Sequence, residues 1–90
     1  MLLEQMAERL HTTPAELERE SLRLYLERRL RFTESELFLL AQRYGVETVF
    51  ELDEAVRAGR FHETETFEDY FQFDYLESQR DSLREMLERV

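Results

Sequence analysis

The sequence predicts an all-α fold, a helical bundle that is expected to be oligomeric. Residues that break helices are rare, with two Gly and one Pro among 90 residues, and each lies where a helix boundary is expected. Apolar residues recur at steps of three and four over long stretches, which is the spacing of one helix face. These observations predict a short helix, a long helix, a second short helix and a C-terminal helix.

The first short helix is expected over residues 2–11, where Leu2, Leu3, Met6 and Leu10 have helical spacing. A start signal for the long helix follows directly. In Thr13-Pro14-Ala15-Glu16, the threonine can cap, proline suits the first helical position, and the glutamate can complete a capping box.

The long helix is expected over about residues 14–44, because no helix breaker follows Pro14 before Gly45. At 1.5 Å per residue it would be roughly 46 Å long. Apolar residues along it alternate steps of four and three, as in a coiled-coil seam with one polar member, Thr33. A helix of this length requires other helices beside it, from the same chain or another copy. The predicted core or oligomer contacts are Leu26, Leu30, Leu37, Leu40 and Tyr44.

Gly45 is a suitable C-cap for the long helix, and Thr48-Val49-Phe50-Glu51 forms a second capping box. A short helix over about 49–58 is expected to end before Gly59. A loop then leads to a C-terminal helix over about 67–89, capped by Thr64 or Thr66. Within it, residues 71–75 alternate like a strand, but helix is favoured because no second strand is available for pairing.

Length and composition predict one helical domain, residues 1–90, with a small core. The chain has no cysteine, so disulfides and thiolate metal sites are excluded. Oligomerisation, or binding to another chain, is the remaining common route to stability in small proteins. Residues 2–46 are therefore interpreted as dimerisation or core helices.

Charge separates the two halves of the chain. Residues 1–46 contain eight acids and seven arginines, a net charge of −1, whereas residues 47–90 contain thirteen acids and five arginines, a net charge of −8. We interpret residues 47–90 as an acidic part that binds a basic partner. The same charge disfavours nucleic acid as the partner.

The segment TFEDYFQFDYLE, residues 66–77, contains five aromatic and four acidic residues. One helix face cannot bury all five rings, so two interpretations remain open. The rings complete a core and a homodimer contact, or they anchor a different, basic protein, with the acids selecting it. The predicted partner-binding residues are Phe67, Glu68, Asp69, Tyr70, Phe71, Phe73, Asp74 and Tyr75.

Several other functions are disfavoured. No P-loop, dinucleotide-binding motif or nucleophile motif occurs, so we expect no enzyme activity and no cofactor. Glu8 and His11, and His62 with Glu63, are interpreted as surface residues, so no metal site is expected. The start of the chain is acidic and lacks the continuous apolar run of a signal peptide, and no segment is long enough to span a membrane. We therefore expect a cytoplasmic protein.

The segment LEQMAERLHTTPAELERESLRLYLERRL, residues 3–30, resembles the two helices of ribbon-helix-helix proteins, many of which are prokaryotic antitoxins. No position matches that family's basic DNA-reading strand, so no DNA-contact residues are carried over. Residues 43–87 are similar in layout to small acidic helical antitoxins, which mask a basic toxin. The resemblance implies an antitoxin that binds and neutralises a toxin. The alternatives are a DNA-binding transcriptional regulator and a self-assembling structural helical protein.

Overall fold

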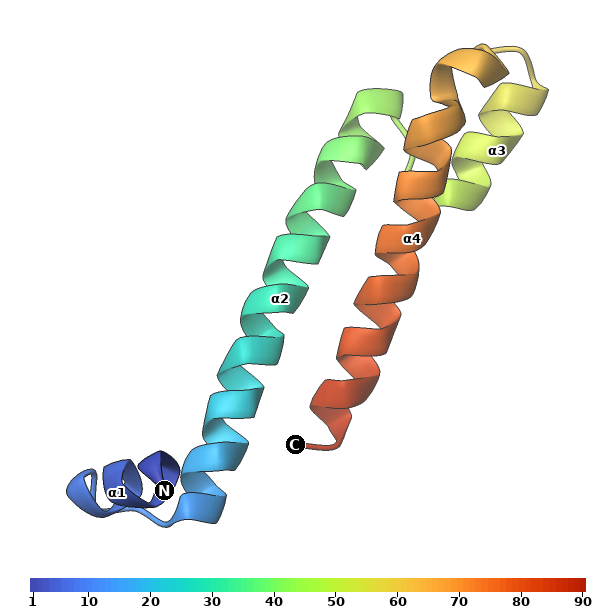
Figure 1. Ribbon diagram of the computed structural model, residues 1–90. Coiled ribbons are helices and arrows are strands. Elements are labelled where there is room, and N and C mark those ends of the chain that lie inside the picture. The colour runs from blue at the N-terminus through green and yellow to red at the C-terminus, as the bar shows by residue number, and fades with distance from the viewer.

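A computed structural model describes all residues, 1–90, and contains helices but no strand, so the predicted all-α class is confirmed. The helices are α1 (Leu2–Arg9), α2 (Pro14–Tyr44), α3 (Val49–Arg57) and α4 (Glu63–Glu88). Helices α2 and α4 lie side by side and antiparallel, forming a long hairpin (Figure 1). Helix α1 packs on the start of α2, and α3 lies beside the first half of α4 at the other end.

The predicted capping residues lie at both ends of α2 and at the start of α3. The Thr13 hydroxyl accepts a hydrogen bond from the Glu16 backbone N–H at 3.1 Å, and the Thr48 hydroxyl accepts one from Glu51 at 3.1 Å. Gly45 ends α2 in the left-handed region, with φ 65°. The Val46 N–H then donates to the Ala41 carbonyl at 3.0 Å, so the last turn is closed as in a Schellman motif.

Three predicted helix ends are corrected. Helix α1 ends at Arg9 because His11 adopts a left-handed conformation, φ 58°, in the turn before α2. Helix α3 ends at Arg57, one residue early. Helix α4 begins at Glu63 rather than 67, so neither predicted threonine caps it. The Thr66 hydroxyl instead donates back to the His62 carbonyl at 3.2 Å, an arrangement that serine and threonine adopt inside helices.

The core lies at the α3 end of the hairpin, where three helices meet. Its members come from α2, the α2–α3 connection, α3 and α4, and they are Leu37, Leu40, Tyr44, Val46, Leu52, Phe73 and Leu76. The predicted seam of α2 therefore faces α4 of the same chain. Leu37, Leu40 and Tyr44 are buried there, while Leu26 and Leu30 are half-buried further along.

The molecule is much longer than a compact domain. Its radius of gyration is 19.0 Å and its extents are 61 × 18 × 18 Å. A compact chain of this length would have a radius of gyration of about 12 Å. Only 12 of the 90 residues are buried, and many large apolar side chains are exposed on α2 and α4. No helix combines the length and the apolar character needed to cross a membrane.

Candidate protein-binding site

The structure separates the five rings of residues 66–77. Phe67, Phe71 and Tyr75 are 58%, 56% and 58% exposed, and Tyr70 is partly buried against the core. Phe73 is only 1% exposed. The prediction that Phe73 anchors a partner is therefore wrong, because this ring fills the space between α4, α2 and α3.

A signal for the position of Phe73 is present in the sequence. The buried residues of α4 are Thr66, Phe73, Leu76 and Leu83, which lie at heptad positions. The same alternation of three and four runs back to Phe73 from the C-terminal residues Val90, Leu87 and Leu83. In the later half of α4 only one face is apolar, so the alternation of three and four residues identifies the buried face there.

Two of the exposed rings form a pair on α4. Phe67 and Phe71 lie one turn apart, with ring centroids 4.9 Å apart and planes at 75°. Tyr70 meets Phe71 edge to face at 5.7 Å. Together with Val56 of α3, these rings line a groove between α3 and α4. We call these four residues, Val56, Phe67, Tyr70 and Phe71, the aromatic patch.

Acidic side chains surround the aromatic patch. Asp53 and Glu63 line the same groove. Asp53 is paired with Arg57 at 3.1 Å, whereas Glu63 forms no ion pair within the chain. Glu68 and Asp74 are exposed on α4 and are also unpaired. The groove and the adjacent exposed surface of α4 therefore present negative charge to solvent.

Asp69 has a structural role that the sequence did not indicate. One of its carboxylate oxygens accepts hydrogen bonds from Arg43 Nη1, at 2.7 Å, and from the Tyr44 hydroxyl. The hydrogen bond from Tyr44, joined by the contact with Arg43, holds the pKa of Asp69 below its usual range, although partial burial opposes this. Partial burial and the same carboxylate raise the pKa of the Tyr44 hydroxyl. Asp69 thus fastens the end of α2 to α4, a role that the prediction of a partner-binding residue did not include.

This contact predicts a pH dependence. Because the folded-state pKa of Asp69 lies below its unfolded value of about 3.9, its contribution is present above about pH 4 and disappears as pH falls through the folded-state pKa. We expect Asp69→Asn to lower the free energy of unfolding by about 1–2 kcal/mol at pH 7. Urea unfolding measured from pH 7 to pH 2.5 should show that the difference in free energy of unfolding between Asp69→Asn and the wild type disappears below pH 4. Asp74→Asn is the control, because Asp74 lies on the same helix without an ion-pair partner, and it should have almost the same free energy of unfolding as the wild type. A difference for Asp69→Asn that does not change with pH would contradict the role of the Asp69 charge.

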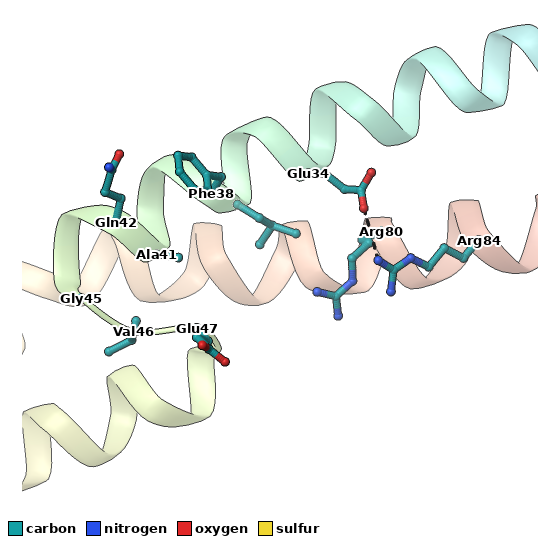
Figure 2. Close-up of a pocket in the computed structure, with 10 residues that line it drawn as sticks. Glu34, Phe38, Ala41, Gln42, Gly45, Val46, Glu47, Arg80 and Arg84 are labelled. Atoms are coloured by element: carbon teal, nitrogen blue, oxygen red, sulfur yellow. Dashed lines mark hydrogen bonds and ion pairs between the residues drawn. The ribbon is translucent and has the colours of Figure 1, made fainter.

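A second hollow lies between α2 and α4 (Figure 2). Its lining includes Phe38 of α2 and two arginines of α4, Arg80 and Arg84. Arg84 pairs with Glu34 across the hairpin at 3.2 Å, and Arg80 pairs with Asp81 at 3.0 Å. Both arginines are therefore occupied within the chain. No group of three or more His, Cys, Asp or Glu side chains is placed to hold a metal ion.

The fold defines the chain as an all-α helical-hairpin protein with a short additional helix at each end. The model of the family described as "Uncharacterized protein MJ0235 family" matches residues 1–90, so the chain belongs to that family. No curated protein and no solved structure matches the chain.

Proposed function

We propose that this chain is a non-catalytic binding protein that recognises a basic protein through the aromatic patch and neutralises it, as an antitoxin does to its toxin. The observation that carries the proposal is the exposure of Phe67 and Phe71 within the charged end of the molecule. Residues 34–78 contain twelve acids and three arginines, a net charge of −9. The other residues contain nine of each, a net charge of zero.

The paired rings are suited to act as anchors. Each is more than half exposed, and burying a phenylalanine side chain contributes about 1.5–3 kcal/mol. Phe67 and Phe71 already contact each other and lie on a regular helix, so little side-chain freedom remains to be lost on binding. Anchors of this kind supply most of the binding energy in many interfaces.

The acids around the groove select the partner. Glu63, Glu68 and Asp74 have no cation within the chain, so a basic surface can pair with them without breaking an existing contact. Such charges mainly raise the association rate and exclude acidic competitors. For the same reason this end of the molecule would repel the phosphates of DNA, which favours the protein partner over the regulator alternative.

The role of the aromatic patch can be tested with a single substitution. We expect Phe71→Ala to raise the dissociation constant of the complex about 30-fold, corresponding to loss of an anchor of about 2 kcal/mol. Phe38→Ala is the matched control, because Phe38 is 63% exposed but lies on α2 beside the other hollow. Isothermal titration calorimetry with the purified partner would measure both.

The partner can be identified by comparing the proteins that bind the wild type with those that bind a variant without the two rings. Tagged wild type and the Phe67→Ser/Phe71→Ser variant would be used in parallel to capture proteins from the native host, followed by mass spectrometry. We expect one small basic protein, captured in a fixed ratio by the wild type and lost with the double variant. Expression of that protein alone should arrest growth, and co-expression of the wild type should restore it. Equal capture by both baits, or binding only of promoter DNA in a gel shift, would contradict the proposal.

A further inference from the structure

A second apolar surface follows the hairpin, separate from the aromatic patch. Tyr25, Phe32 and Leu39 recur every seven residues along α2 and are 58%, 64% and 56% exposed. Heptad spacing places them on one stripe, next to the stripe that faces α4. On α4, Tyr75 lies on the same side, because Phe32 and Tyr75 line one groove between the two helices. We call Tyr25, Phe32, Leu39 and Tyr75 the groove face.

From this surface we infer that a second copy of the chain packs on the groove face in the antiparallel direction, so that two hairpins form a four-helix bundle. This inference goes beyond the proposed function and uses a different side of the molecule. The half of the hairpin farther from α3 has only a thin core, since no residue of α2 before Thr33 is buried and Leu83 is the one buried residue of α4 after Leu76. Helices that are apolar beyond one stripe need a further partner, and two paired hairpins satisfy that need.

Charge determines the direction of the second copy. The whole net charge of −9 lies in residues 34–78, at the α3 end. A parallel arrangement would place two such ends together. An antiparallel arrangement places each acidic end beside residues 14–31 of the other copy, which contain five arginines and four acids. Like charges are thereby separated, and a two-fold axis makes the contact the same for both copies.

The aromatic patch borders the contact of this dimer without forming its centre. Phe67 and Phe71 line the groove with α3, whereas Tyr75, one turn after Phe71, lines the groove with α2. The dimer therefore presents one patch at each end of an elongated bundle. Loss of dimerisation and loss of partner binding can be measured separately.

The mass of the purified full-length chain tests the association. Sedimentation equilibrium over 1–100 µM is expected to give twice the chain mass of 11.0 kDa. Phe32→Glu and Tyr75→Glu should each weaken the dimer by about 100-fold or more, because the symmetry buries two unpaired carboxylates at once. Circular dichroism would establish that both variants remain helical. Phe50→Glu, on α3 and 67% exposed, should leave the dimer unchanged.

The direction is tested by labelling. The chain has no cysteine, so a nitroxide can be attached uniquely at Ala15→Cys near the start of α2. At 1.5 Å per residue, the two labels should be on the order of 40 Å apart in the antiparallel dimer and below about 20 Å apart in a parallel one. The shorter distance would overturn the inference. A monomer throughout the concentration range, or dissociation by Phe50→Glu instead of Phe32→Glu, would also overturn it.

Discussion

Replacement of Phe73 by alanine is expected to lower the free energy of unfolding by about 3–5 kcal/mol, the range for removing a buried aromatic side chain. Phe73 is 1% exposed and belongs to the cluster with Leu40, Leu52 and Leu76. Since α2, α3 and α4 all contribute to that cluster, no single helix can move to fill the cavity. A small chain has little stability in reserve, so this change would remove much of the total.

Urea unfolding monitored by circular dichroism would measure this effect, with Phe71→Ala as the control. Phe71 lies two residues away on the same helix and is 56% exposed, so its removal should cost less than about 1 kcal/mol. Both variants would be compared at one protein concentration, because self-association would add to the apparent stability. Equal losses for the two variants would show that the α2–α4 seam does not run through Phe73.

The helix boundaries that could be predicted depend on local chemistry. Thr13 and Thr48 act through their hydroxyls on a backbone N–H three residues later, and Pro14 and Gly45 act through their own backbone. The sequence therefore contains the whole interaction. The start of α4 was missed because its N-cap, His62, makes no side-chain capping bond. A helix that begins without a cap leaves no local signal, and the nearby threonines gave a misleading one.

The seam of α2 was predictable because Leu26, Leu30, Leu37, Leu40 and Tyr44 recur at steps of three and four, with Thr33 as the one polar member. Near the start of α4 the rings occupy most of the circumference, so periodicity does not select the buried face. The residues around the rings do not select Phe73 over Phe67 and Phe71. The selection comes from the later part of the seam, which runs back from Leu83 and Leu76 to Phe73, and from packing against α2 and α3. The role of Asp69 was inaccessible for a similar reason, since Arg43 and Tyr44 lie 26 and 25 residues away.

The elongated shape follows from how the four helices are arranged. The α2–α4 hairpin keeps both long helices side by side, while α1 and α3 are too short to cover them (Figure 1). The predicted seam is used within the chain, and the residues that widen it, such as Phe32 and Leu39, remain exposed. Surplus apolar surface on α2 is thus the observation that links the sequence to the inferred dimer.

Replacement of Leu52 by alanine is expected to cost about 2–5 kcal/mol and to act mainly on α3. Leu52 is 0% exposed and is the largest side chain that fixes this short helix to α4. A helix of nine residues is not stable alone, so loss of this contact should open α3 before the hairpin unfolds. Hydrogen exchange should show faster exchange for the amides of residues 52–57 than for those of residues 26–37.

The same variant connects stability with binding. Because Val56 of α3 lines the groove with Phe67 and Phe71, opening α3 should weaken partner binding while leaving the groove face intact. Phe50→Ala is the control, since Phe50 lies on α3 but is 67% exposed, and it should change neither exchange nor dimerisation. Faster exchange spread evenly over α2, α3 and α4 would contradict independent opening of α3. Full partner affinity in a Leu52→Ala protein whose α3 is open would show that the rings of α4 suffice without α3.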